Sequence, residues 1–432
     1  MRRAWARTAI PLPLLALVLP LRLEGQDPAA ADTTLVRLTR EAVAANAGLS
    51  ADQARARAAA ARVRAAGALP DPMLNTGVMD LTLPNFAFHE SDFTEVDVEL
   101  SQEFPWFGTL GARTRAAGAE ARMRGADVRT RRRDVVARTA ALYYRLRYVV
   151  GAQTIIARQR VLLETGVEIS TTRYATGSVA QSDPLQARVA RARLDTEAAA
   201  LAAEEAGVRA DLKALRSIRS TDALAVQPID AESVYVALEG NELHRAVERE
   251  DPDTLLLAHP RLESRRAAIE AAEATARVEA LGARPDFTFT TRYGARPLGS
   301  DFFSAFVGLR LPLWAGRKQH RLAEAARDEA VAARSDLADE TLALTAELDR
   351  VRADAEAGRI RLRLLVTQVV PSALLTTEAA LRSYRVGQVD FLNVLAVEDA
   401  LYRARLDAVQ VAAEHLTHLV MLRQLLAAGD DQ

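Results

Sequence analysis

Cysteine is absent from this chain of 432 residues. Its absence excludes disulfides, thiolate metal sites and a lipid attached through an N-terminal cysteine. Aromatic residues are scarce at 5%, and the net charge is only -1. The low aromatic content, beside abundant alanine, leucine, arginine and glutamate, favours long helices over a large β-rich core. The near-neutral charge gives no support to nucleic-acid binding, so we expect no nucleic-acid partner.

Long apolar runs are also missing beyond the first residues. Arg2, Arg3 and Arg7 precede a short apolar stretch, Ala9 to Leu21, which is the pattern of a secretory signal peptide. We predict that residues 1–26 are such a leader, with an N-terminal membrane anchor as the alternative. No later apolar run reaches about 18 residues, so we expect no transmembrane helix. The chain is then predicted to be exported, either soluble or held in a membrane as a β-barrel.

What the sequence does contain is a duplication. The stretch EFPWFGTL (residues 103–110) returns in the second half as RLPLWAGRK (residues 310–318), and these two stretches hold two of only three tryptophans. Two Pro-Asp pairs, at Pro70 and Pro285, precede them at a similar offset. An ordered set of motifs at near-constant offset indicates an internal repeat.

The repeat predicts the domain organisation. Each copy reads as a helix, a β-hairpin, a long helix, a tip and a return helix. We predict copies at 27–217 and 258–426, joined by an inter-repeat equatorial element at 218–257 and followed by a disordered tail at 427–432. The expected hairpins lie at about 71–105 and 286–312, and the tips at about 174–183 and 384–390.

The hairpins alternate apolar and polar residues, which predicts strands with two unlike faces. The apolar positions, which we expect to form a lipid face, are Val96, Val98, Leu100, Phe287, Phe289, Val307 and Leu309. A half-buried soluble sheet is the alternative. Four strands cannot close a membrane barrel, which needs about eight, and open edges are not tolerated in lipid. If the strands enter a membrane, several copies must therefore share one barrel.

The Pro-Trp-Gly clusters follow the hairpins in both copies. A proline can end a strand where no ladder donor is needed, a tryptophan suits the lipid–water boundary, and a glycine permits a sharp change of direction. We therefore predict strand-to-helix corners at the membrane boundary, although a plain corner with a packed tryptophan is the alternative. The residues are Pro105, Trp106, Gly108, Pro312, Trp314 and Gly316.

The long helices are expected from Leu110 to Tyr174 and from Lys318 to Tyr384. Each has about 65 residues, or roughly 100 Å, a length typical of coiled coils or helical arrays. A Tyr-x-x-Gly motif followed by an aspartate ends each one. Glycine can cap a helix in the left-handed conformation, and an aspartate favours the next helix N-terminus. The tip residues are Tyr174, Gly177, Asp183, Tyr384, Gly387 and Asp390, and the aspartates either stabilise helices or surround a pore mouth.

Chemistry for catalysis or for a cofactor is not evident in the sequence. His415 and His418 share a helix face and could bind a metal, but no third ligand is near them in sequence. Ordinary packing histidines are the favoured interpretation. We therefore expect no catalytic residues, no metal site and no cofactor.

Together, the leader, the duplicated helix–hairpin–helix, LPDP…EFPWFG and YxxGxVxxxD resemble the TolC-type outer-membrane efflux family, closest to its heavy-metal-efflux branch. The resemblance covers essentially the whole chain after the leader. It departs at Ala47, where the family often has proline, whereas the second copy keeps Pro260. The lipidated cysteine frequent in the metal branch is absent as well.

The resemblance implies a mainly α fold with a small β part: antiparallel coiled-coil hairpins, and two β-hairpins that give four strands per chain to a trimeric 12-stranded barrel in outer-membrane lipid. It implies a passive exit duct of a tripartite efflux system for small solutes, heavy-metal ions or drugs, with its helices in the periplasm. The implied partners are two further copies, a periplasmic adaptor and an inner-membrane pump of the RND type. A periplasmic coiled-coil adaptor or scaffold, and an exported enzyme, are the alternative functions.

Overall fold

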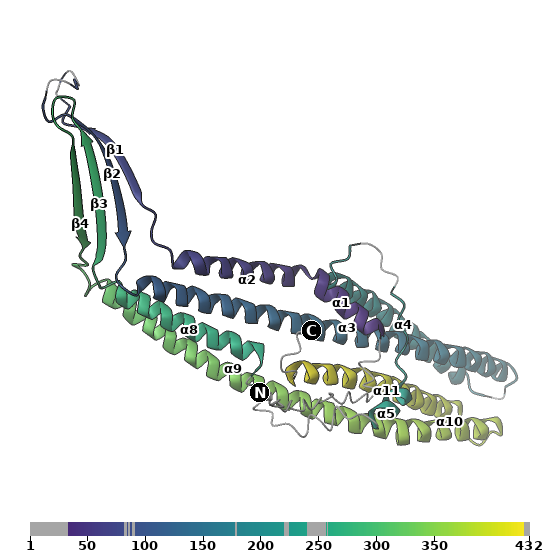
Figure 1. Cartoon of the computed structure of the whole chain (residues 1–432). Coiled ribbons are helices and arrows are strands. Elements are labelled where there is room, and N and C mark those ends of the chain that lie inside the picture. The colour runs from purple at the N-terminus through teal and green to yellow at the C-terminus, as the bar shows by residue number, and fades with distance from the viewer. Residues whose placement is uncertain are drawn as a thin grey trace, which may run out of the picture.

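The computed structural model shows an elongated molecule with a small sheet at one end and long helices running away from it (Figure 1). The structure describes residues 33–81, 84, 87–88, 91–177, 179–219, 224–239, 256 and 258–426. The predicted leader and the predicted tail lie outside these residues, as does much of the inter-repeat element. Those predictions therefore stay predictions.

The sheet has four antiparallel strands, β1 (Met73–Met79), β2 (Glu95–Phe104), β3 (Asp286–Ala295) and β4 (Phe302–Arg310). Their order is β1-β2-β3-β4, so the hairpins of the two copies join through β2 and β3. Strands β1 and β4 are the two edges. A mainly helical fold with one small antiparallel sheet confirms that part of the predicted fold class, while the trimeric 12-stranded barrel stays a prediction.

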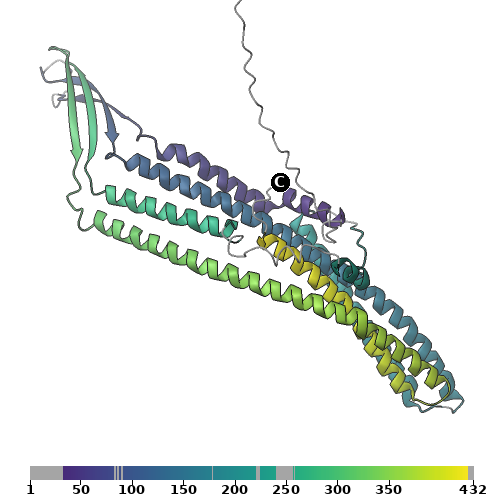
Figure 2. The ribbon, with the colours of Figure 1, turned by 60° about the horizontal axis from the view of Figure 1, so that its bottom comes forward.

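Next to the sheet, four helices form a row, α2 (Ala47–Ala66), α3 (Thr109–Ala175), α8 (Pro260–Leu281) and α9 (Gln319–Leu364), as Figure 2 shows. Helix α3 packs on α2 and α8, and α8 packs on α9. Ala112, Ala119 and Ala126 recur every seven residues and are buried. Such small residues allow the helices to pack closely. A short helix, α1 (Thr33–Ala45), precedes α2 and also packs on α3.

Away from the sheet, the row consists of α4 (Ser182–Leu215), the lower part of α3, α11 (Phe391–Leu426) and α10 (Val370–Arg385). Helix α3 contacts α4 and α11, and α11 contacts α10, which leaves α4 and α10 at the edges. These helices form two antiparallel hairpins that end together at the far tip (Figure 2).

The second long helix is not the uniform α-helix expected from Lys318 to Tyr384. A π-helical segment, η1 (Leu365–Val369), separates α9 from α10, and the N–H of Val370 donates to the carbonyl of Leu365. Pro371 follows directly and has no N–H to donate. Because proline disturbs the regular hydrogen-bond ladder, a local π turn beside it has a physical cause.

One described segment differs from the expectation that no later stretch could cross a membrane. By length and composition alone, the helix Gln319–Arg385 could cross a membrane. An 18-residue window within it has a mean hydropathy of 1.4, and 6% of that window is buried. The run LLVTQVVPSALL, from the last residue of α9 through η1 into α10, carries no charge. Its threonine, glutamine and serine break the continuous apolar run sought in the sequence. This helix packs on α11 within the row, and several of its apolar side chains are exposed in the single chain.

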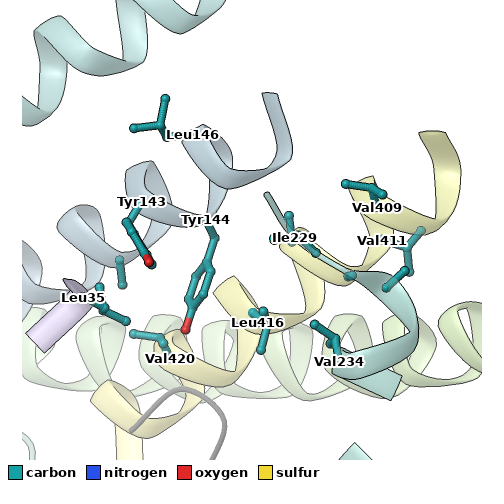
Figure 3. Close-up of a cluster of buried hydrophobic side chains, with 14 of the residues drawn as sticks. Leu35, Tyr143, Tyr144, Leu146, Ile229, Val234, Val409, Val411, Leu416 and Val420 are labelled. Atoms are coloured by element: carbon teal, nitrogen blue, oxygen red, sulfur yellow. The ribbon is translucent and has the colours of Figure 1, made fainter. Parts of the chain in front are cut away.

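The largest core cluster among the described residues lies where α3 of the first copy meets α11 of the second (Figure 3). Tyr144 and Leu146 of α3 are 1% and 0% exposed and pack with Leu416 of α11. The inter-repeat segment adds Ile229 and the short helix α5 (Ala231–Glu239) to the same cluster. Burial of several large apolar side chains, each contributing about 1.5–3 kcal/mol, holds the two copies together at this level.

Candidate functional sites

The two faces of the sheet are chemically opposite. The pairing register aligns Val98 with Tyr293, and Phe289 with Val307, so the predicted lipid-face residues of β2, β3 and β4 share one face. Four other apolar residues lie on the opposite face: Met73, Met79, Phe302 and Phe306. The lipid face is open: Val98 is 43% exposed and Val307 is 74% exposed. An uncovered apolar face of this extent marks an interaction site.

The opposite face carries ion pairs that link different strands. Glu95 and Asp97 are 5% and 8% exposed, and Arg292 pairs with both of them. Arg310 pairs with Glu103 at 2.5 Å. Buried carboxylates require such partners, so this polar face is built to be stable without an apolar core. The alternating sequence indicated two unlike faces, but the individual pairs were not predicted, because they depend on which strand lies beside which.

At the first corner, a left-handed glycine turns the chain from strand to helix. Gly108 has φ 86° and directly precedes α3. The backbone N–H of Trp106 donates to Asp286 at 2.9 Å, which ties the corner to β3. The Trp106 ring stacks on Phe287 at 5.7 Å. Because Phe287 belongs to the open apolar face, the tryptophan extends that face to the corner.

The second corner also turns the chain from strand to helix, but it does so without a left-handed glycine. Pro312 follows β4, and overlapping turns carry the chain to α9: the N–H of Ala315 donates to Pro312, and that of Lys318 donates to Trp314. Gly316 is not among the residues with positive φ, and an added Cβ would meet no atom. The expectation that Gly316 supplies conformational freedom therefore does not hold. Trp314 is 71% exposed.

At the far tips, both glycines have left-handed backbones. Gly177 has φ 71° and Gly387 has φ 76°. The N–H of Gly177 donates to the carbonyl of Tyr174 at 2.9 Å, and the N–H of Gly387 donates to that of Tyr384 at 3.1 Å. Other residues adopt such a conformation at a cost of roughly 1–2 kcal/mol, so the glycines in the Tyr-x-x-Gly motifs have a backbone reason.

The remaining tip residues are not equivalent between the copies. Tyr384 is 9% exposed and packs on Phe391 with ring centroids 5.7 Å apart, whereas Tyr174 is 43% exposed. Asp390 accepts a hydrogen bond from the N–H of Asn393 at 2.9 Å and so caps α11. Asp183 lies in the first turn of α4 and accepts from the hydroxyl of Ser182 at 3.2 Å.

The two tips also contact each other. The guanidinium of Arg173 lies 4.8 Å from the centre of the Tyr384 ring, which is cation–π distance. Gly166 of α3 lies against Phe391, because a Cβ there would be 3.4 Å from the ring. Arg173 and Phe391 were not predicted as site residues. The sequence did hold a signal for Phe391, because this aromatic residue stands directly after the tip aspartate Asp390.

Within the described residues, no group of three or more histidine, cysteine, aspartate or glutamate side chains could hold a metal ion. His415 is 1% exposed, and its Nδ1 would lie 3.1 Å from a Cβ added to Gly358. That position is a packed core site between α11 and α9.

Comparisons with known proteins place the chain. The sequence model of the family described as outer membrane efflux protein matches residues 38–219 and 252–428. The cobalt-zinc-cadmium resistance protein CzcC of Cupriavidus metallidurans is 27% identical over 268 residues, which is 58% of this chain and 60% of CzcC. The match thus spans less than two thirds of that relative.

Solved structures share the fold. The outer-membrane channel OprN has a TM-score of 0.75 at 19% identity, over 93% of this chain and 91% of its own. A membrane protein from Pseudomonas aeruginosa has a TM-score of 0.79 at 17% identity, over 92% and 93%. CusC gives 0.75 at 17%, also over 92% and 93%. Family and neighbours are channels rather than enzymes. Because the family match spans most of the sequence, this chain belongs to the outer membrane efflux protein family, as the TolC-type resemblance predicted.

Proposed function

We propose that this protein is the outer-membrane exit duct of a tripartite efflux system. Three copies form one 12-stranded barrel in the outer membrane, and their helices form a tunnel through the periplasm. The observation that carries the proposal is the sheet: one apolar face is open, the other face is ion-paired, and both edge strands are bare.

The two edge strands of the sheet need partner strands from other copies of the chain. Strands β1 and β4 each have one side without a partner strand in this chain. In lipid, an unpaired backbone group costs several kcal/mol, and only closed barrels avoid that cost. A ring in which β4 of one copy pairs with β1 of the next satisfies every edge, and three copies of four strands exceed the minimum of about eight.

The helical edges support the same ring. Along the sheet-proximal edge, Val331 and Leu342 of α9 are 55% and 71% exposed. Along the far edges, Leu375 of α10 is 66% exposed and Val189 of α4 is 53% exposed. A neighbouring copy that continues the row covers these side chains, as well as the apolar segment of η1 and α10.

The far tips are then the entrance. Tyr174, Gly177 and Asp183 of one hairpin, with Tyr384, Gly387 and Asp390 of the other, are proposed to meet a periplasmic adaptor, while an inner-membrane pump of the RND type supplies the energy. Similarity to a cobalt-zinc-cadmium resistance protein favours heavy-metal ions as the cargo, among small solutes in general.

Cysteine cross-linking tests the shared barrel directly, because the natural chain has no cysteine. Thr76→Cys on β1 is combined in turn with Phe303→Cys, Ala305→Cys or Val307→Cys on β4. Paired strands bring opposite Cα atoms to about 4.5–5.5 Å, within disulfide range. We expect covalent trimers in the outer-membrane fraction for the pair that is in register, and none for Thr76→Cys alone. A soluble periplasmic monomer that cross-links in no combination contradicts the proposal.

A further inference from the structure

Ion pairs connect α3 and α8 in a regular ladder that fails at its end near the sheet. Arg129 pairs with Glu263, and one heptad closer to the sheet Arg122 pairs with Glu270. The same step from 122 to 115 and from 270 to 277 places Arg115 opposite Arg277. Two cations therefore meet where the pattern had placed a cation and an anion.

These two arginines line a hollow of about 380 Å³ between α3 and α8. Both are exposed, and among the described residues neither forms an ion pair. The carboxylates of the hollow are already engaged, Glu270 by Arg122 and Glu273 by Arg334. Two guanidinium groups without a counter-charge in one hollow form a site for an anion, and their fork geometry suits phosphate oxygens.

A second basic hollow is lined by the end of α8 and the start of α9. Its volume is about 680 Å³, and its lining includes Arg284, His320 and Arg327. The one carboxylate in its lining, Glu324, pairs with Arg321 at 2.7 Å. Arg284 lies three residues beyond the end of α8 at Leu281, so the excess positive charge continues past α8 toward the sheet.

Both hollows are lined by residues near the starts of α3 and α9 and the end of α8. These helix ends lie directly below the sheet (Figure 1). The two strand-to-helix corners carry exposed apolar side chains: Phe107 at the first is 79% exposed, and Leu313 and Trp314 at the second are 79% and 71% exposed. Arg115 lies about 10 Å along α3 from the corner at Gly108. The polar headgroup layer of a bilayer is about 5–8 Å deep on each side, and an arginine side chain can reach across the difference.

A neighbouring copy does not account for Arg115 and Arg277. The helices beside the sheet are ordered α2, α3, α8 and α9, so a copy that continues the row meets α2 and α9. The hollow of Arg115 and Arg277 lies between the two middle helices. Continuation of the row at α2 and α9 would therefore leave this hollow uncovered.

We propose that the two hollows bind the phosphate groups of anionic phospholipids in the membrane leaflet at the helical end of the barrel. Arg115 and Arg277 hold one headgroup, and Arg284 with Arg327 holds another, while the aromatic corner contacts the acyl chains. The lipid fixes the depth of the barrel in the bilayer. This inference rests on the proposed function, because it needs the sheet to lie in lipid.

The test compares lipid binding to the detergent-solubilised trimer. Short-chain phosphatidylglycerol is titrated into the wild type and into the double variant Arg115→Gln/Arg277→Gln, with phosphatidylcholine of the same chain length for comparison. At about fivefold per arginine near a membrane surface, we expect the double variant to bind phosphatidylglycerol about 25-fold more weakly. The control Arg382→Gln/Arg403→Gln removes the same charge at the far end and should bind like the wild type.

Three results overturn the inference: equal wild-type affinity for the two lipids, an unchanged affinity in the double variant, or complete displacement of phosphatidylglycerol by millimolar inorganic phosphate, which would indicate a free-anion site. Insertion into vesicles of pure phosphatidylcholine separates the two proposals. Failure of the wild type to insert contradicts the proposed duct, whereas normal insertion without a preference for phosphatidylglycerol contradicts this inference alone.

Discussion

The two copies of the repeat build the same elements by different local means. The first copy turns from strand to helix at a left-handed Gly108, and the second uses overlapping turns after Pro312. The first long helix, α3, is continuous over 67 residues, and the second is interrupted by the π segment beside Pro371. The path of the chain is thus shared, while the local geometry is not.

The two copies share the residues that the backbone conformation requires. Gly177 and Gly387 both have positive φ, and no side chain near them explains the glycine otherwise. What differs follows the packing partners. Phe391 comes directly after the tip aspartate of the second copy, where the first copy has Pro184. Tyr384 therefore has an aromatic partner and is buried, and Tyr174 is not.

The largest expected effect compares the two hairpins. Val98→Arg in the first and Val307→Arg in the second each place a charge on the open apolar face, and each should destabilise the inserted barrel by about 2–4 kcal/mol if near the bilayer midplane. The measurement is the urea dependence of folding into vesicles. Thr288→Arg is the control, because it adds the same group to the polar face directly opposite Glu103.

Equal losses for Val98→Arg and Val307→Arg would place the two hairpins at the same depth. A large difference between them would show that only one hairpin reaches the midplane. If both were tolerated as well as Thr288→Arg, the open face would not contact lipid.

The next comparison concerns the two tip tyrosines. Tyr384→Ala removes a buried ring that packs on Phe391 and lies under Arg173, and should cost about 3 kcal/mol. Tyr174→Ala should stay within about 0.5 kcal/mol, because its ring is exposed. Denaturant unfolding of the detergent-solubilised trimer measures both.

Tyr384→Phe sharpens this test. The Tyr384 hydroxyl is buried and forms no hydrogen bond within the described part of the chain. Its removal should therefore be neutral or slightly stabilising. A loss as large as that of Tyr384→Ala would mean that the hydroxyl, rather than the ring, holds the two tips together.

A third comparison concerns the caps at the starts of α2 and α8. Asn46 accepts from the N–H of Leu49 at 2.9 Å, and His259 accepts from that of Arg261 at 3.3 Å. Burial, followed by the positive charges of Arg133 and Arg261, lowers the pKa of His259 from 6.5 to about 4. The unfolded chain therefore binds the proton more readily, and stability falls as the pH drops from about 6.5 toward 4.

His259→Asn gives the second copy the cap of the first. We expect it to remove about 2 kcal/mol of this acid-induced loss while retaining the cap at neutral pH. The check is the free energy of unfolding measured from pH 7 to pH 4 for both proteins. The same pH dependence in wild type and variant would assign the loss to other groups.

The sequence predicted most of the path of the chain, because its signals are local. Alternation placed the strands and their apolar faces, and the Tyr-x-x-Gly motif placed the end of α3 to within one residue of Ala175. The pairing of β2 with β3, the contact of Arg173 with Tyr384, and the π segment were not predictable. Each depends on which distant residues become neighbours, and a single sequence does not encode that in any local period.

The role of the tip aspartates shows where such prediction ends. The sequence left two roles open for the tip aspartates, helix stabilisation and a place at a pore mouth. The structure distinguishes Asp183 from Asp390 only in how each one contributes to helix stabilisation. Asp390 caps α11 through a backbone hydrogen bond, whereas Asp183 accepts from the hydroxyl of Ser182 in the first turn of α4. Whether either one lines an entrance depends on the other copies of the ring.

The smallest expected effect compares these two aspartates. Asp390→Ala removes a cap and should cost about 1 kcal/mol, while Asp183→Ala loses only a dipole interaction of a few tenths of a kcal/mol. Hydrogen exchange of the first turns of α11 and α4 measures the difference, and equal losses would contradict it. Asp390→Asn then separates cap from charge, since asparagine caps as well as aspartate. Normal protection of α11 with reduced export of a cation would assign the Asp390 charge to the entrance, and normal export would leave the residue a cap alone.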